Sequence, residues 1–189
     1  MTSKTHSKKN KKALFLDRDG VINHDYGYVH KAKDFKFIDG IFELLSYASS
    51  KNFLIIVITN QAGIGRGFYS EKDFHILSNW MNQEFHKKKI LIDKIYFSST
   101  HPTEGLGPYK KDDYRRKPNP GMIFEASNEM GIDLSKSVLI GDKYTDIEAG
   151  NAAKIGTNIL FQNSNFIPPN KNSFKYELIC NLALAKNFL

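Results

Sequence analysis

Residues 53–59 read FLIIVIT, an apolar run rich in β-branched side chains. Its length suits a strand better than a helix. Strands that are apolar on both faces are typical of parallel sheets covered by helices on both sides, whereas half-exposed strands alternate apolar and polar residues. The run therefore predicts a central strand in an α/β protein.

Short apolar runs alternate with amphipathic stretches along the rest of the chain. Ser70, for example, is a favourable N-cap for an amphipathic stretch that follows it. Because short connections join the strands to the helices, we expect a Rossmann-like three-layer sandwich with a mostly parallel sheet. Further strands are expected at residues 13–16, 92–98, 137–140 and 157–161, and helices at 40–50, 71–86, 120–130 and 146–153. Residues 163–172, which contain Pro168 and Pro169, are expected to form a surface linker to a last helix.

Length and charge predict one folded domain with a basic tail. We expect a disordered tail over residues 1–11 and a single domain over 12–189. The formal net charge is +7, and five lysines lie within the first 12 residues. Such a run could contact nucleic acid or an anionic membrane, but a solvated tail is the preferred interpretation.

The absence of a long apolar stretch and the use of one cysteine bear on the location of the protein. No stretch approaches the ~20 apolar residues of a membrane span. Cys180 is the sole cysteine, so an intramolecular disulfide is impossible, and its apolar neighbours predict a buried thiol. We therefore expect a cytoplasmic protein with neither a nucleic-acid nor a membrane partner.

Asp17 and Asp19 follow the first predicted strand in the sequence ALFLDRDG. The carboxyl ends of strands in open α/β sheets are where ligands bind. Two carboxylates this close repel each other unless a cation or divided proton-transfer roles employ them. A strand followed by an Asp-Gly turn would account for the same residues. This motif alone therefore leaves both a functional site and a plain turn open.

Polar side chains also lie at the ends of other predicted elements, along the same edge of the sheet. An aspartate can attack phosphorus, and a second carboxylic acid can exchange protons with the leaving oxygen and with water. Oxygen ligands suit Mg²⁺, and a lysine with a hydroxyl stabilises phosphoryl charge. The set therefore predicts Mg²⁺-dependent phosphoryl transfer. Its further members are Thr59, Asn60, Arg116, Lys117, Asp142, Lys143 and Asp146. For Asp146, a place at the start of a helix, where an acid is favourable, is an equally good interpretation.

Four segments together resemble the motifs of the haloacid dehalogenase superfamily of phosphatases, over residues 14–160. They are DRDG at 17–20, ITN at 58–60, RKP at 116–118 and GDKYTD at 141–146. The resemblance implies that Asp17 is the nucleophile and Asp19 the general acid/base. It implies that Thr59 and Lys117 hold the phosphoryl group, and that Mg²⁺ is bound by Asp17, the Asp19 carbonyl and Asp142.

Finer features resemble the D-glycero-D-manno-heptose 1,7-bisphosphate phosphatases. They are GVIN at 20–23, GY at 27–28, NQAGIGRG at 60–67 and RKPNPGM at 116–122. The resemblance implies hydrolysis of the bisphosphate to a monophosphate, in ADP- or GDP-heptose synthesis for surface glycans, by a monomer without a large cap domain. Histidinol phosphate is the alternative substrate, and a nucleic-acid end a less favoured one. Substrate contacts are expected from Asp25, Tyr26, Gly27, Tyr28, Asn60, Gln61, Arg66, Arg116 and Lys143.

The loop before RKP departs from these relatives, which usually hold a structural zinc there with three cysteines and a histidine. The matching positions do not form a good zinc ligand set, so we expect no structural zinc. We expect packing by Tyr109 and Tyr114 to order the loop. The matching positions are Ser98, Thr100, Asp113 and Arg115.

Overall fold

The computed structural model describes residues 10–162 and 174–189. Its centre is a sheet of six parallel strands in the order β3-β2-β1-β4-β5-β6. The strands of this sheet are β1 (Lys12–Leu16), β2 (Phe53–Asn60), β3 (Lys94–Ser98), β4 (Val138–Gly141), β5 (Thr157–Phe161) and β6 (Glu177–Ile179). The α/β prediction is confirmed, and the sheet is parallel throughout the described strands.

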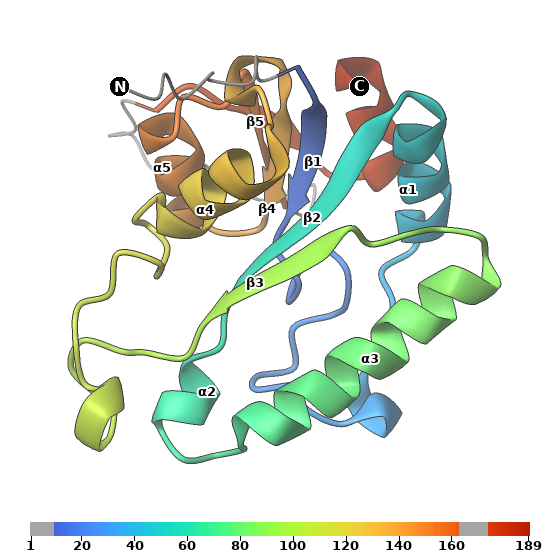
Figure 1. Ribbon diagram of the computed structural model, residues 1–189. Coiled ribbons are helices and arrows are strands. Elements are labelled where there is room, and N and C mark those ends of the chain that lie inside the picture. The colour runs from blue at the N-terminus through green and yellow to red at the C-terminus, as the bar shows by residue number, and fades with distance from the viewer. Residues whose placement is uncertain (1–9, 163–173) are drawn as a thin grey trace, which may run out of the picture.

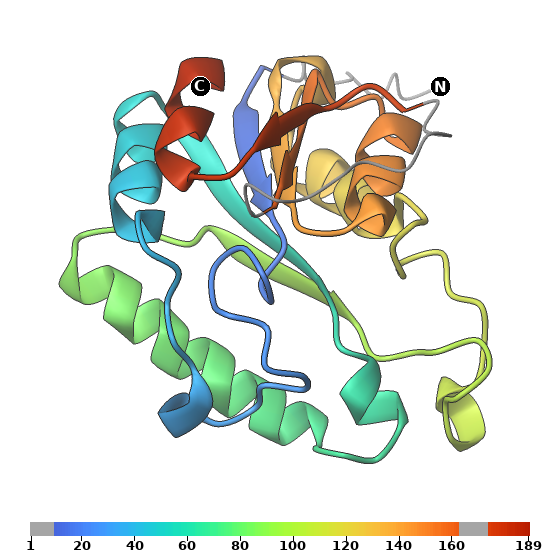
Figure 2. The ribbon, with the colours of Figure 1, turned by 180° about the vertical axis from the view of Figure 1, so that it is seen from behind.

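Helices cover both faces of the sheet (Figure 1). One face packs against α1, α3 and η4, and the other packs against α4 and α5. Figure 2 shows η4 beside α1 at the back of the molecule. The helices are α1 (Ile41–Ser50), α2 (Ala62–Gly65), α3 (Glu71–Lys87), α4 (Gly121–Met130) and α5 (Tyr144–Ala152), with the 3₁₀ helices η1 (Ala32–Asp34), η2 (Gly107–Tyr109), η3 (Leu134–Lys136) and η4 (Leu182–Phe188).

The two central strands carry apolar side chains to both faces. Leu14 of β1 packs into the core beside α1 and α3, whereas Phe15 packs into the core beside α4 and α5. Ile55 and Ile56 of β2 divide between the two cores in the same way. Side chains alternate along a strand, so a strand between two helical layers must be apolar at every position. This explains the uninterrupted run in the sequence.

Local sequence signals correctly predict where α3 begins and where α4 ends. The Ser70 hydroxyl accepts a hydrogen bond from the Asp73 amide, and the Asp73 carboxylate accepts one from the Ser70 amide, a capping box at the start of α3. Gly131 ends α4 in the left-handed region, with φ 70°. The strands and helices whose bounds were predicted are each found, with bounds that differ by at most two residues.

The C-terminal part differs from expectation. Strand β6 was not predicted, because three residues at a sheet edge carry little pattern. The expected last helix is the 3₁₀ helix η4. Cys180 is exposed, so the prediction of a buried thiol is wrong. Cys180 directly follows β6. The side chain buried in the core at this point is that of the preceding residue, Ile179.

Two predictions fall largely outside the described residues: most of the basic tail, and the linker at 163–172. Lys11, assigned to the tail, forms a β-bridge with Ile132.

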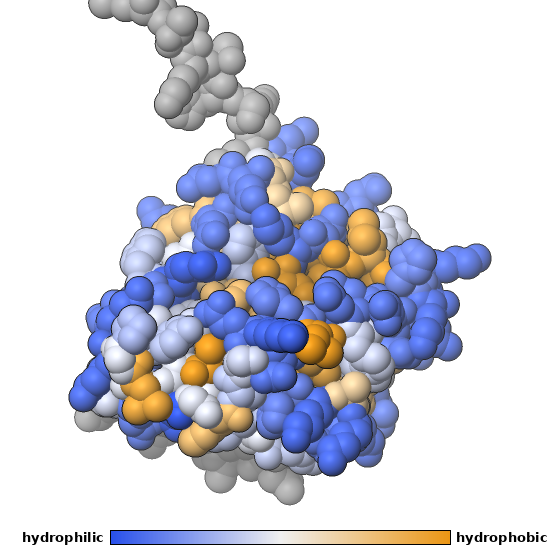
Figure 3. All heavy atoms as spheres, turned by 60° about the horizontal axis from the view of Figure 1, so that its bottom comes forward, coloured by the Kyte–Doolittle hydropathy of each residue, from blue (hydrophilic) through white to orange (hydrophobic). Residues whose placement is uncertain are grey.

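None of the described helices is both long and apolar enough to cross a membrane. Figure 3 shows the face around α2 and α3 turned forward. On this face, small patches of apolar residues lie among hydrophilic residues.

The strand order places a topological switch at β1. The chain passes from β1 to β2 on one side, while β4 pairs with β1 on the other. Connections leaving in opposite directions open a crevice beyond the carboxyl ends of the strands, where such sheets bind ligands. The predicted residues Asp17, Thr59 and Asp142 lie at the carboxyl ends of β1, β2 and β4, along this edge.

Candidate active site

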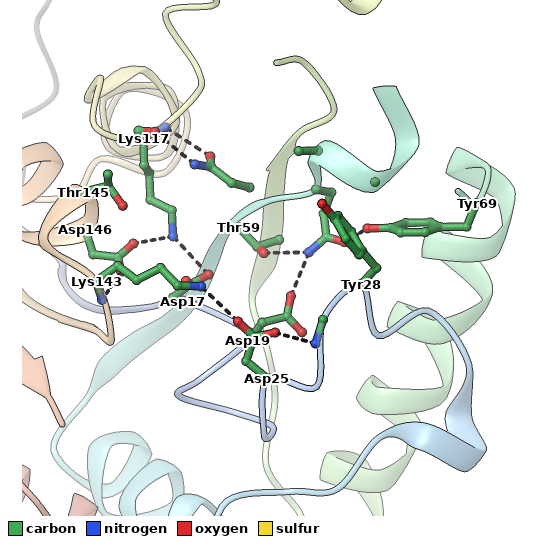
Figure 4. A pocket seen from close by; sticks show the side chains of 15 residues that line it. Asp17, Asp19, Asp25, Tyr28, Thr59, Tyr69, Lys117, Lys143, Thr145 and Asp146 are labelled. Atoms are coloured by element: carbon green, nitrogen blue, oxygen red, sulfur yellow. Dashed lines mark hydrogen bonds and ion pairs between the residues drawn. The ribbon is translucent and has the colours of Figure 1, made fainter. Parts of the chain in front are cut away.

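An open pocket of about 350 Å³ lies beyond the carboxyl ends of β1 and β2 (Figure 4). Its polar lining comes from several separate segments of the chain. The lining residues are Asp17, Asp19, Asp25, Gly27, Tyr28, Thr59, Asn60, Gln61, Ala62, Gly63, Tyr69, Lys117, Lys143, Thr145 and Asp146. The catalytic residues predicted from the sequence, and most of the predicted substrate contacts, therefore meet in one pocket.

Asp17 is fixed at the end of β1 by contacts to one carboxylate oxygen. Its Oδ1 lies 3.0 Å from the Lys117 ammonium and accepts a hydrogen bond of 2.7 Å from the Arg18 amide. Burial raises the pKa of Asp17; the Lys117 charge opposes that rise, and Asp146 adds to it. The Asp17 carboxylate is thus buried, oriented and next to a cation.

Lys117 is almost fully buried, at 3% exposure, and joins two acids. Its ammonium lies 2.5 Å from Oδ1 of Asp146 and donates a hydrogen bond of 2.9 Å to the Ile58 carbonyl. Burial would lower the pKa of Lys117, but the Asp146 and Asp17 carboxylates outweigh it and raise the pKa. The pocket therefore contains a fixed positive charge beside Asp17.

The side chain of Asn60 engages the backbone of Lys117. Its amide Nδ2 donates to the Lys117 carbonyl at 2.9 Å, and its Oδ1 accepts from the Lys117 amide at 3.1 Å. Asn60 lines the pocket as predicted, but both amide atoms contact the peptide of Lys117. It thus positions the loop that carries the lysine.

Asp19 lies within a group of hydrogen-bond donors. The Arg18 guanidinium contacts both of its oxygens, with a shortest distance of 2.8 Å. Asn23 donates to Oδ1 at 3.0 Å, and Gln61 donates to Oδ2 at 3.1 Å. The carboxylate is therefore held in one orientation from three directions.

Gln61 also connects Thr59 with Tyr69. Its amide Nε2 donates to the Thr59 hydroxyl at 2.8 Å, and its Oε1 accepts from the Tyr69 hydroxyl at 2.5 Å. Because the Thr59 oxygen accepts this hydrogen bond, its own proton is available for a ligand. Burial raises the pKa of Tyr69 to about 12, so the phenol remains a donor at neutral pH.

Asp142 brings a third carboxylate to Asp17 and Asp146. One oxygen from each of the three lies within 4.8 Å of the others. Oδ1 of Asp142 is buried and receives no hydrogen bond from the described residues. Burial, and next the Asp17 charge, raises the pKa of Asp142 to about 8. When ionised, such a cluster of acids carries excess negative charge, which suits a hard cation.

Lys143 and the loop containing Asp25 close one side of the pocket. The Lys143 ammonium donates to Oδ2 of Asp25 at 3.0 Å and lies 3.7 Å from Asp142. Burial would raise the pKa of Asp25, but hydrogen bonds from Lys143 and the Gly27 amide outweigh it and lower the pKa. The predicted contacts Asp25, Gly27 and Lys143 are thus brought together.

Three predicted substrate contacts do not line the pocket. Arg66 forms an ion pair with Glu104 and a hydrogen bond to the hydroxyl of the pocket residue Tyr28. Arg116 donates to the Thr100 carbonyl at 2.8 Å. Tyr26 is exposed and stacks on a neighbouring histidine.

The positions that match the zinc ligands of relatives form hydrogen bonds with one another. The Ser98 and Thr100 hydroxyls lie 3.1 Å apart, and Thr100 donates to the Asp113 carboxylate at 3.5 Å. Arg115 pairs with Glu125 at 3.1 Å. The contact between Thr100 and Asp113 connects the two arms of the loop, and the Arg115 ion pair joins the loop to α4.

The two tyrosines expected to order this loop behave differently. Tyr109 packs against the core beside α3, and Gly105 allows its backbone to approach closely. Tyr114 is 61% exposed, so the expectation that it packs to order the loop is wrong. Hydrogen bonds take the place of that packing.

Sequence reasoning gave no role to two residues of the site and left a third undecided. Arg18 lies buried between the two motif aspartates, and Tyr69, which precedes the N-cap residue of α3, orients Gln61. The sequence leaves open whether Asp146 begins a helix or belongs to the site, and the structure shows both: its Oδ2 accepts from the Lys143 amide, while its Oδ1 contacts Lys117. Its spacing from Asp142 was the available signal.

Comparisons with proteins of assigned function give long matches. The D-glycero-alpha-D-manno-heptose-1,7-bisphosphate 7-phosphatase of Burkholderia mallei is 54% identical over 149 residues, 79% of each chain. The protein of the same name from Campylobacter jejuni is 48% identical over 149 residues, 79% of this chain and 81% of that one. The D-glycero-beta-D-manno-heptose-1,7-bisphosphate 7-phosphatase of Vibrio cholerae is 45% identical over 150 residues, 79% and 81% of the two chains.

Solved structures and a family model agree with these relatives. A putative HAD-like phosphatase from Mesorhizobium loti superposes with a TM-score of 0.82 at 28% identity, covering 94% of this chain and 87% of that one. D,D-heptose 1,7-bisphosphate phosphatase from B. bronchiseptica shares the fold, with a TM-score of 0.76 at 22% identity over 93% and 96% of the chains. The HAD-hydrolase-like family model matches residues 114–163. The chain therefore belongs to the HAD-like phosphatases, in the family of the D-glycero-D-manno-heptose-1,7-bisphosphate 7-phosphatases.

Proposed function

We propose that the protein is a Mg²⁺-dependent phosphatase that removes the 7-phosphate of D-glycero-D-manno-heptose 1,7-bisphosphate. One observation carries the chemistry: Asp17 lies 3.0 Å from the buried Lys117 ammonium, with the Asp142 and Asp146 carboxylates grouped around it. The names of relatives at 38–54% identity support the substrate. The polar lining of the pocket suits a phosphosugar.

The α-anomer is the proposed form of the substrate. Two relatives named for the alpha anomer are 54% and 48% identical to this chain. Those from Vibrio cholerae, Haemophilus influenzae and Pasteurella multocida, which are named for the beta anomer, are 45%, 44% and 45% identical. The difference is modest, so both anomers belong in the test.

The acids at this edge fit a divalent cation. Four carboxylates, Asp17, Asp25, Asp142 and Asp146, face two ammonium groups, those of Lys117 and Lys143. Two formal negative charges remain, and the buried Oδ1 of Asp142 needs a partner. We propose Asp17, Asp142 and the Asp19 carbonyl as ligands of Mg²⁺. Bound Mg²⁺ would offset the repulsion between the carboxylate nucleophile and the anionic phosphate.

Asp17 acts as the nucleophile in the first step. Its Oδ1 is engaged by Lys117 and Arg18, so Oδ2 is the proposed attacking oxygen. The bond from Oδ2 to phosphorus forms as the bond from phosphorus to the sugar oxygen breaks. Lys117 and the Thr59 hydroxyl bind phosphoryl oxygens, where negative charge is concentrated.

Asp19 moves the proton in both steps. As a carboxylic acid it protonates the departing C7 oxygen, which becomes the sugar hydroxyl. It then takes a proton from water as that water attacks the phosphorus of the aspartyl-phosphate. The P–O bond to Asp17 breaks, inorganic phosphate leaves, and both carboxyl groups return to their starting states.

The proposed setting is the cytoplasm, where a monomeric enzyme would serve the synthesis of nucleotide-activated heptose for surface glycans. The use of a single cysteine in the whole chain is in keeping with a reducing compartment. The small polar pocket supports a small phosphosugar rather than a nucleic acid as partner.

The test is phosphate release with Mg²⁺ from both anomers of the bisphosphate and from histidinol phosphate. We expect preference for the bisphosphate, and a loss of at least about 10³-fold in kcat for Asp17→Asn. Asp112→Asn, an exposed acid outside the pocket lining, is the matched control. Preference for histidinol phosphate would overturn the substrate, and activity retained by Asp17→Asn would overturn the mechanism.

A further inference from the structure

Arg18 is a buried arginine between the two motif aspartates. Its side chain is 1% exposed and is among the largest fully buried side chains of the described residues. The guanidinium lies over the Phe74 ring of α3, 5.8 Å from its centroid. Arginine remains charged even when buried, so a full positive charge lies inside the protein directly behind the pocket.

The contacts of this charge are few and directed. Nε and Nη2 contact the Asp19 carboxylate at 3.1 and 2.8 Å, and Nη2 also donates to the Val29 carbonyl at 2.7 Å. Nη1 is buried and has no hydrogen-bond partner among the described residues. Burial of a cation with one donor unpaired costs free energy. Stability alone therefore does not account for the arginine.

The same guanidinium connects Asp19 with the loop that lines the pocket. Val29 is buried and directly follows Tyr28, which lines the pocket together with Asp25 and Gly27. Nη2 thus joins the carboxylate of the proposed general acid/base to the backbone of residues 25–29, which we call the substrate loop. Two donors in a planar fork fix both the position and the plane of a carboxylate, which a single ammonium cannot do.

We propose that Arg18 is a positioning residue, which holds the Asp19 carboxyl in line with the leaving oxygen and ties it to the substrate loop. The inference rests on the proposed role of Asp19. It predicts that loss of the fork impairs proton delivery to the leaving group more than it impairs attack by Asp17. Attack depends instead on the separate contacts of Asp17 with Lys117 and the Arg18 amide, and the amide is retained in any Arg18 variant.

The leaving group separates these two effects. The C7 oxygen of the heptose leaves only when it receives a proton, whereas nitrophenolate leaves without one. We would measure kcat/KM for heptose bisphosphate and for p-nitrophenyl phosphate with wild type and Arg18→Lys. We expect Arg18→Lys to lose about 10- to 100-fold on the sugar and less than about threefold on the aryl ester. Both substrates use one preparation, so partial misfolding cancels in the ratio of the two values.

Two further variants make the outcome decisive. Asp19→Asn tests the proposed acid/base role, and it should show the same leaving-group dependence in stronger form. Asp93→Asn is a structural control, since its carboxylate accepts a hydrogen bond from the Ile55 amide within the sheet. It should leave the ratio unchanged.

The possible results separate the inference from the function beneath it. Equal losses on both substrates for Arg18→Lys, with the expected dependence for Asp19→Asn, would overturn the inference alone. The absence of leaving-group dependence in Asp19→Asn would overturn the proposed role of Asp19. Arg18→Met, which fills the buried space without a charge, should repeat the loss on the sugar, and a ratio like that of wild type would also overturn the inference.

Discussion

Gly20 and Asp142 approach so closely that a side chain on the glycine would occupy the position of the carboxylate. A Cβ atom on Gly20 would lie 2.3 Å from Oδ2 of Asp142, and the glycine has φ +94°. Gly20→Ala should therefore displace Asp142 and weaken the proposed Mg²⁺ site. We expect a loss of about 1–3 kcal/mol in the free energy of unfolding, and a higher Mg²⁺ concentration for half-maximal activity.

Gly27→Ala provides the control for Gly20→Ala. Gly27 has a similar φ of +78°, but a Cβ atom there would meet nothing within 4 Å. Gly27→Ala should share the backbone strain and keep the Mg²⁺ dependence of wild type. Chemical denaturation and Mg²⁺ titration of both variants separate strain from displacement. Equal Mg²⁺ dependence in the two variants would refute the proposed effect on Asp142.

Asn60→Ala should impair catalysis through the backbone of Lys117. The substitution removes both partners of the Lys117 peptide, whose hydrogen bonds to Asn60 are 2.9 and 3.1 Å long. Unpaired buried peptide groups cost about 1–3 kcal/mol, so we expect a lower melting temperature and a fall of about tenfold or more in kcat/KM. Asn79→Ala, at an exposed position on α3, should change neither.

Tyr69→Phe should release the amide of Gln61. The Tyr69 hydroxyl donates to Oε1 of Gln61 at 2.5 Å, which fixes the amide with its NH₂ group toward Thr59. Without that donor the amide can flip and present its oxygen to Thr59. We expect kcat to fall by about three- to tenfold, equivalent to roughly 1 kcal/mol. Kinetics of the exposed Tyr114→Phe, which should match wild type, provide the comparison.

Mg²⁺ should stabilise the protein more at high pH than at low pH. Burial raises the pKa of Asp142 to about 8 without metal, against an ordinary value of 3.8. The folded state then binds more protons than the unfolded state between those values, so its stability falls as pH rises through this window. Mg²⁺ binds the ionised carboxylate. The increase in melting temperature with Mg²⁺ should be larger at pH 8 than at pH 5, and equal shifts would contradict this account.

The central layers could be predicted because burial on both sides leaves a direct trace in the sequence. Strand β2 is apolar on both faces, and helix α3 begins at a capping serine. Both signals are local and strong. Strand β6 has neither, because two of its three residues are exposed and its position depends on pairing with β5. Edge strands of this length are set by tertiary contacts.

The candidate site could be predicted where chemistry requires particular residue types at strand ends. Asp17, Thr59 and Lys117 were expected together and line one pocket. The burial of Arg18 could not be predicted, because a charged residue is normally exposed unless a partner is fixed beside it. Its partners are set by the turn after β1 and by the loop ending at Val29.

The parallel sheet has a consequence for how the protein becomes active. Asp17, Thr59, Lys117 and Asp142 come from four distant parts of the chain, and they meet only after β1 has paired with both β2 and β4. A fragment or a partly folded chain can hold much of its helix content and still lack a reaction centre. Recovery of phosphatase activity after denaturation is therefore a stricter measure of completed folding than recovery of the circular dichroism signal.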